Sequence, residues 1–141
     1  MRIMNLSLRQ SIAYQKLPFE ESSPEGGYQM IMAYLSDAPI GSEVIMVMND
    51  ALEVSFLGQR EPYDEAALEK IANAEALDAE EGDFILEAGS YHFAQFPIEG
   101  RFDEYSTSEL ALKTGDQLFM RILKEAELGY SPQFWVKRRV E

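Results

Sequence analysis

The patterns along this chain predict an α+β fold, with an antiparallel or mixed sheet and two main helices packed on one face. Strand-like runs gather in the first half around a turn at Asn49 and Asp50, and two later segments, 63–77 and 114–129, repeat apolar residues at helical spacing. At 141 residues, of which 46% are hydrophobic, the chain has the size and the apolar content of one ordinary domain. We therefore expect a single domain over residues 1–141.

The N-terminal part of the chain combines strand and loop signals. Residues 1–17 alternate apolar and polar side chains in places, which predicts one or two strands. Residues 18–27, PFEESSPEGG, gather Pro, Ser and Gly and predict a loop. Residues 28–35, YQMIMAYL, are nearly all apolar and predict a central strand buried on both faces, although a short buried helix would show the same run.

A hairpin and then a helix follow. SEVIMVM and ALEVSFLG, residues 42–48 and 51–58, flank Asn49 and Asp50, two residue types that tolerate the left-handed backbone of a tight turn. In the segment 63–77, Asp64 is placed as the N-cap of a helix, with Tyr63 before it positioned to pack on Leu68.

The second half is expected to alternate strand, helix and strand. FILE and SYHFAQF, residues 84–87 and 90–96, predict a hairpin turning at Ala88 and Gly89. In the segment 114–129, Leu118 and Ile122 mark an apolar stripe of a helix that packs on the sheet, and Gly129 is its expected C-terminal cap. A last strand is expected from residue 133 onward.

The charge of the chain limits its partners. The formal net charge is −13, from 25 acidic and 12 basic residues, so phosphate backbones and anionic membranes are repelled and no direct nucleic-acid or membrane binding is expected. No apolar run approaches the ~20 residues of a membrane helix, and no export signal is visible. We expect a cytoplasmic location, with the acidic surface serving either solubility or a basic partner.

Catalytic and metal chemistry find little support in the sequence. The chain contains no cysteine and one histidine, His92. A metal site built from thiolates or from several histidines is therefore excluded, and so is a catalytic relay through a second histidine. DAEEGDFILEAG resembles a calcium loop in composition only, because Asp83 stands where the glycine belongs and Gly89 where the bidentate glutamate belongs. Nothing singles out a pair of carboxylates. We therefore predict no enzyme activity, no catalytic residue, no metal and no cofactor.

Aromatic residues supply the candidate ligand contacts. On the strand expected around His92, Tyr91 and Phe93 share one face and His92 lies on the other. Trp135, the sole tryptophan, lies in the last expected strand, and aromatic walls with a few polar groups are typical of small-molecule pockets. Tyr91, His92, Phe93 and Trp135 are thus predicted to contact a ligand, while ordinary core packing is the alternative for each.

The C-terminal part of the chain resembles a known family. From Leu86 onward, AGSYHFAQF, then Gly100, DQLFMRILKEAELGYSP and QFWVKR are similar to the second half of gyrase-inhibitory-protein-like domains, which also serve as effector-binding modules of AraC-type and MerR-type regulators. The resemblance implies a non-enzymatic α+β ligand binder with an acidic groove for cationic, aromatic-rich compounds. It departs at Trp135, Val136 and Lys137, where the family tends to have a glutamate followed by an aromatic, so no binding glutamate is transferred.

Two functions therefore compete. The first is a non-catalytic binding domain for small apolar or cationic ligands in an aromatic and acidic groove. The alternative is an acidic protein-interaction or inhibitor subunit that binds a basic partner surface. A salt-sensitive complex with a basic protein would favour the second, because long-range attraction between opposite charges is screened by salt.

Overall fold

The structure is a computed structural model of the chain. It describes residues 2–5, 12–20, 23–73, 75, 77–86, 90–94, 114–127 and 129–137, and for 2–5 and 90–94 it describes the backbone alone. The elements in chain order are β1 (Arg2–Asn5), β2 (Ile12–Lys16), α1 (Pro24–Asp37), β3 (Glu43–Met48), β4 (Val54–Arg60), α2 (Glu65–Ala72), β5 (Phe84–Leu86), β6 (Ser90–Ala94), β7 (Gln117–Ala126) and β8 (Gly129–Lys137). Strands dominate, and the two helices make this an α+β fold.

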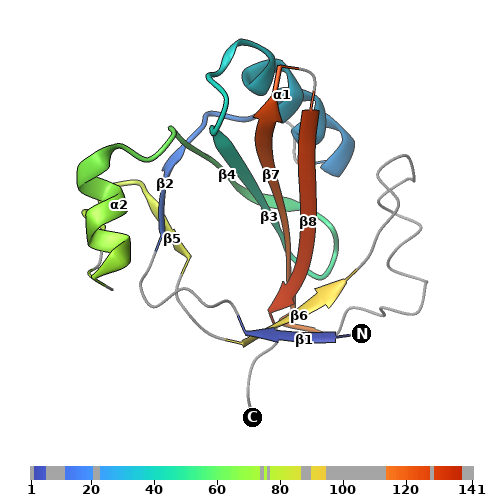
Figure 1. The fold of residues 1–141 in the computed structure, drawn as a ribbon. Helices are drawn as coiled ribbons and strands as arrows, with labels where there is room; N and C mark the ends of the chain where they lie inside the picture. The colour runs from blue at the N-terminus through green and yellow to red at the C-terminus, as the bar shows by residue number, and fades with distance from the viewer. Residues whose placement is uncertain are drawn as a thin grey trace.

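The strands form one antiparallel sheet in the order β1-β6-β8-β7-β3-β4-β2-β5. Its two terminal pairs, β1 with β6 and β2 with β5, come from the same two stretches of chain, 2–16 and 84–94. Figure 1 shows the consequence: β2 and β5 lie on one side, β7 and β8 on the other, and β1 and β6 cross below them. The sheet is therefore curled into a barrel-like shape.

Chain length explains this curling. Leu86 ends β5, at one end of the strand order, and Ser90 begins β6, next to the other end. Four residue steps of extended chain span at most about 14 Å. The two ends of the sheet must therefore lie close together, which a flat sheet of this many strands would not allow.

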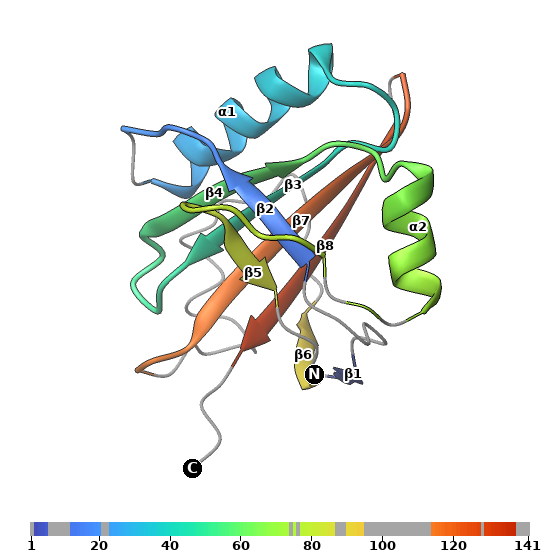
Figure 2. The same cartoon turned by 90° about the vertical axis from the view of Figure 1, so that its left-hand side faces the viewer.

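Curling divides the apolar residues into an outer and an inner core. The outer core lies between α1 and the strands beneath it (Figure 2), and its buried residues are Ile31, Leu35, Val44, Met46, Met48, Leu52, Val54, Leu57, Leu118, Met120, Ile122, Phe134 and Val136. The inner core lies on the concave side and contains Ile12, Tyr14, Ile45, Val47, Leu86, Phe119 and Trp135, with Phe56 and Phe84 packed against it. Alternate residues of β3, β7 and β8 thus serve the two cores in turn.

The segment 24–37 is a helix. The expected loop therefore holds at 18–20 but is wrong from Pro24 onward, and at 28–35 the alternative of a helix is observed instead of the expected strand. Ser23 is the N-cap, its Oγ accepts from the Gly26 N–H at 3.2 Å, and Pro24 occupies the first turn. Gly27 brings the helix close to the sheet, because a Cβ there would meet the Met46 sulfur at 2.6 Å. Gly27, one of the glycines that suggested a loop, is thus needed for this close packing.

The segment 114–129 is not a helix. Residues 117–126 form β7, which pairs with β8 in a long hairpin, and Gly129 begins β8 rather than capping a helix. Ile122 is buried, as expected, but it packs from a strand beneath α1. Leu118 and Ile122 are four residues apart, a spacing shared by a helical stripe and by one face of a strand. Because both faces of β7 are covered, the alternation that would have indicated a strand is hidden.

The pairing expected around Ala88 and Gly89 is also wrong. Strands occur at 84–86 and 90–94, but β5 pairs with β2, whereas β6 pairs with β1 and β8. Residues 87–89 lie outside the described part of the chain. The two strands therefore belong to opposite ends of the sheet instead of forming a hairpin.

Two other predictions are confirmed. β3 and β4 form the expected hairpin, although the residue with positive φ is Leu52, at 60°, and Asn49 instead accepts the Ala51 and Glu53 N–H groups through its side chain, each at 2.9 Å. The helix expected at 63–77 appears as α2, 65–72, with Asp64 as N-cap.

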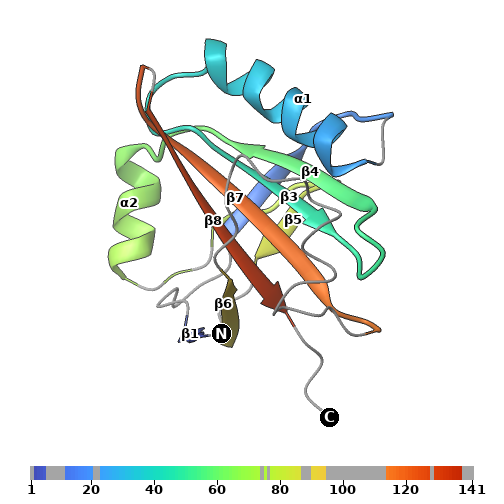
Figure 3. The same ribbon diagram turned by 90° about the vertical axis from the view of Figure 1, so that its right-hand side faces the viewer.

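The packing of both helices on one face is not confirmed. α1 lies on the outer face of the sheet, while α2 lies beyond β2 and β5, away from α1 (Figures 1 and 3). No residue of α2 is buried, and Leu68, the expected packing partner of Tyr63, is 54% exposed. Of the two helices in the described residues, α1 therefore contributes buried side chains to the core and α2 does not.

Candidate functional site

The residues predicted to contact a ligand lie on two neighbouring strands. Tyr91, His92 and Phe93 belong to β6, and Trp135 belongs to β8. In the β6–β8 register Phe93 lies opposite Trp135 and His92 opposite Val136. The backbone register thus places Phe93 next to Trp135, while the side chains of β6 are outside the described part of the structure.

Trp135 itself lies inside the curled sheet. Its side chain is 1% exposed and belongs to the inner core with Tyr14 and Phe119. Its indole Nε1–H is buried and has no hydrogen-bond partner among the described residues. The guanidinium carbon of Arg121 lies 5.6 Å from the centre of the indole ring, within the range of a cation–π contact. Trp135 therefore borders a charged cluster that the sequence analysis did not identify.

Glu43 is the centre of this cluster. It is the first residue of β3 and lies opposite Arg60 in the register with β4. Arg121 comes from β7, where it lies opposite Ile45, two residues beyond Glu43 along β3. Both guanidinium groups form ion pairs with the Glu43 carboxylate, and Arg121 Nη2 donates to Oε2 at 3.0 Å. Tyr14, from β2, donates its hydroxyl to Oε1 at 2.8 Å.

Burial gives these contacts their strength. The side chain of Glu43 is 1% exposed, that of Arg60 10% and that of Arg121 19%. Burial raises the pKa of Tyr14 to about 12, because the phenolate would lose its hydration, although the charges of Arg121 and Arg60 act in the opposite direction. The ring of Tyr63 lies 3.9 Å from the guanidinium carbon of Arg60 and covers it. The cluster, which we call the Glu43 cluster (Tyr14, Glu43, Arg60, Arg121), therefore places charges within an otherwise apolar interior.

Part of this cluster had a signal in the sequence. Glu43 is a lone carboxylate at the head of the apolar run VIMVM, but the expected two-residue turn at Asn49 and Asp50 would place it opposite Phe56. The observed register, in which Met48 pairs with Val54, places it opposite Arg60 instead. Arg121 had no such signal, because its segment was interpreted as a helix. Pairing of charged residues across strands can thus be predicted from sequence only where the strands and their register are already recognised.

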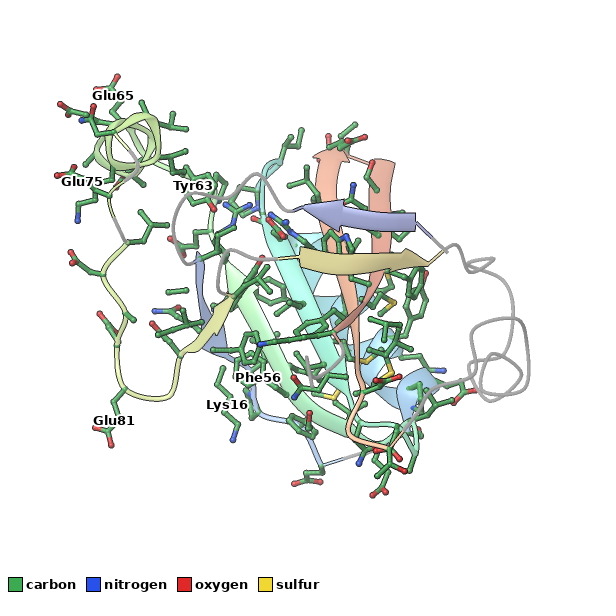
Figure 4. All side chains as sticks on the ribbon, turned by 90° about the horizontal axis from the view of Figure 1, so that it is seen from below. Lys16, Phe56, Tyr63, Glu65, Glu75 and Glu81 are labelled. Carbon is green, nitrogen blue, oxygen red and sulfur yellow. The ribbon has the colours of Figure 1, made fainter. Side chains whose placement is uncertain are left out.

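A second feature is the acidic arm, which we define as residues 61–83. It contains nine acidic residues, eight of them exposed, and one basic residue, Lys70. Figure 4 shows Glu65, Glu75 and Glu81 along the arm, away from the sheet, with Tyr63 at its base. Three of the carboxylates make contacts within the arm. Asp64 caps α2, Asp78 forms an ion pair with Lys70 at 3.0 Å, and Asp83 accepts the Glu80 N–H at 2.6 Å. The other six point to solvent without an ion-pair partner among the described residues.

Two structural findings concern metal ions and membranes. Within the described ranges no group of three or more His, Cys, Asp or Glu side chains is arranged to hold a metal ion. In the same ranges, neither helix combines the length and apolar character that crossing a membrane would require.

Comparison with known proteins gives no family for this chain. No family model matches it, and neither the curated proteins nor the solved structures contain a significant match. One feature of the family resemblance also changes, because the segment interpreted as its long amphipathic helix forms β7 and the beginning of β8. Function must therefore be argued from the Glu43 cluster and the acidic arm.

Proposed function

We propose that this chain is a non-catalytic binding domain that contacts a basic protein surface through its acidic arm. The observation that carries the proposal is the concentration of charge. With nine acidic residues and one lysine, residues 61–83 have a net charge of −8, out of −13 for the whole chain. Such a field attracts a positively charged partner and accelerates its association.

The arm also offers apolar contacts. Leu68 on α2 is 54% exposed and Ile85, just beyond the arm, is 45% exposed, whereas no residue of α2 is buried against the sheet. Stable interfaces commonly combine a buried apolar centre with a charged rim. The arm therefore fits a partner that places basic side chains around an apolar ridge, such as an amphipathic basic helix.

The experiment compares two variants of equal charge. One replaces Glu65, Glu75 and Glu81 of the arm by Gln, and the matched control replaces the exposed Glu20, Glu53 and Glu125, which lie elsewhere, by Gln. The probe is a synthetic amphipathic helix of Lys and Leu, and its Kd is measured by isothermal titration calorimetry at two salt concentrations. We expect the arm variant to lose about tenfold in affinity, because each exposed ion pair contributes about 0.2–1 kcal/mol. Equal losses in both variants would overturn the proposal.

A groove for a small apolar cation, lined by Tyr91, His92, Phe93 and Trp135, is the second candidate. The register that places Phe93 opposite Trp135 favours it. We rank it second because the Trp135 side chain is buried and because the charged group against its ring is the guanidinium of Arg121, which repels a cation. Saturable quenching of Trp135 fluorescence by tetraphenylphosphonium would support the groove.

A further inference from the structure

The Glu43 cluster carries more positive than negative charge. Arg60 and Arg121 contribute two guanidinium groups, and Glu43 is the one carboxylate of the described residues that pairs with them. Placing an uncompensated charge in a buried site is costly, because the surrounding medium screens it poorly. The described cluster thus has a surplus of one positive charge.

The carboxylate has no remaining capacity for hydrogen bonds. Oε1 accepts from the Tyr14 hydroxyl and lies against Arg121 Nε, and Oε2 accepts from Arg60 and from Arg121 Nη2. Two oxygens of an ionised carboxylate offer about four acceptor sites, so Glu43 is saturated. The Tyr14 hydroxyl oxygen, with which Arg60 also interacts, is the one further side-chain acceptor among the four residues of the cluster, so any donor beyond it needs an acceptor from elsewhere.

Two such donors are present. The side chain of Arg60 is nine-tenths buried, and its Nε has no hydrogen-bond partner among the described residues. The same holds for Trp135 Nε1, and Arg121 packs against that indole ring. A buried donor without an acceptor costs about 1–3 kcal/mol, so native proteins rarely keep one without a ligand or water.

We propose that the Glu43 cluster binds one small monovalent anion, held by the guanidinium groups of Arg60 and Arg121. The anion supplies the missing negative charge and the missing acceptor together. Guanidinium groups suit this role because they are always charged and present several donors in one plane. The burial of Tyr14 and Trp135 limits the ligand to a small ion, such as acetate, nitrate or iodide. The inference is independent of the acidic arm.

The overall charge of the protein makes such binding easy to recognise. At a net charge of −13 the protein repels anions in general, so an anion that accumulates next to Trp135 does so because of a local site. Trp135 is the sole tryptophan, and its fluorescence therefore reports on this site alone.

The test measures quenching of Trp135 fluorescence by iodide and by caesium at equal ionic strength. We expect saturable quenching by iodide and little by caesium, and we expect acetate, which does not quench, to protect against iodide. Arg121→Gln should raise the half-saturating iodide concentration at least tenfold. Lys137→Gln, which removes an exposed cation of the same strand as Trp135, is the matched control and should leave the curve unchanged.

A purely structural role of the Glu43 cluster predicts a different quenching result. Weak, linear iodide quenching with the same slope in the wild type and in Arg121→Gln would show that the cluster is only a structural ion-pair network. If Arg121→Gln fails to fold, Arg60→Lys decides the question, because it keeps the charge and removes the Nε donor. An iodide curve unchanged by Arg60→Lys would also overturn the proposal.

Discussion

Lys124 on β7 donates its ammonium to the carbonyl of Leu35, 2.8 Å away at the end of α1. The same ammonium donates to the carbonyls of Ser36 at 3.3 Å and Ala38 at 2.7 Å. The last turn of α1 has no basic residue of its own, so this lysine from a distant strand satisfies carbonyls that a helix leaves free at its C-terminus. The contact ties α1 to the sheet at the end opposite its Ser23 cap.

Replacing Lys124 by Met should destabilise the protein by about 2–3 kcal/mol, because it removes three charge-assisted hydrogen bonds to the end of α1. The measurement is chemical denaturation in urea. Lys137→Met, at an exposed position of β8, is the control and should change stability by less than about 0.5 kcal/mol. Equal effects of the two substitutions would contradict a capping role for Lys124.

Glu43→Gln should cost about 2–4 kcal/mol, because it leaves two partly buried guanidinium groups without their counter-charge. The amide keeps the shape of the side chain, so the loss reflects charge rather than packing. Glu53→Gln removes an exposed carboxylate from the neighbouring turn and should be nearly neutral. A wild-type urea midpoint for Glu43→Gln would mean that the ion pairs contribute nothing net to stability.

The stability of the protein should fall between pH 10 and pH 12. The pKa of Tyr14 is raised from 10.0 to about 12 in the folded protein, so the folded state keeps the phenol proton over a range in which the unfolded chain has lost it. This contribution is fully present below pH 10 and is lost as the pH rises through about 12. It amounts to about 3 kcal/mol.

Comparing the wild type with Tyr14→Phe isolates this contribution. The variant loses the hydrogen bond to Glu43 at every pH, but it has no phenol to titrate at position 14. The stability difference between the two proteins should therefore shrink from pH 9 to pH 12, while the other titrating groups cancel. A difference independent of pH would show that Tyr14 titrates normally.

The sequence predicts a helix or strand best where one face of that segment is exposed to solvent, because polar residues then mark the period. β4 and α2 have exposed positions, so Glu53 and Ser55, or Glu65 and Glu69, reveal their period, whereas every residue of β3 is buried. α1 and β7 lack such a signal. The two glycines in the first turn of α1 resemble a loop, and the close packing of Gly27 on Met46 becomes visible only with the sheet in place.

The acidic arm could be predicted from the sequence, whereas the Glu43 cluster could not be predicted in full. The acidic arm is visible in the composition, because nine acidic residues fall between 61 and 83. The pair of Glu43 and Arg60 depends on the observed β3–β4 register, which the expected two-residue turn does not give, and Arg121 joins them only through the pairing of β3 with β7. Pairings between strands far apart in sequence leave no local pattern, since they depend on the closing of the whole sheet.

The terminal strand pair of β2 and β5 can be tested with engineered cysteines, because the chain contains none of its own. Ala13 and Ile85 are direct partners in the β2–β5 ladder, so Ala13→Cys with Ile85→Cys should form a disulfide on mild oxidation and stabilise the fold by about 2–4 kcal/mol. The control places the cysteines at Ile85 and His92, which would be opposite each other in a hairpin turning at Ala88 and Gly89. Because β5 and β6 do not pair in the structure, this second variant should keep free thiols. Thiol titration and intact mass distinguish the two results, and preferential cross-linking of the 85 and 92 pair would restore the hairpin and remove the barrel-like closure.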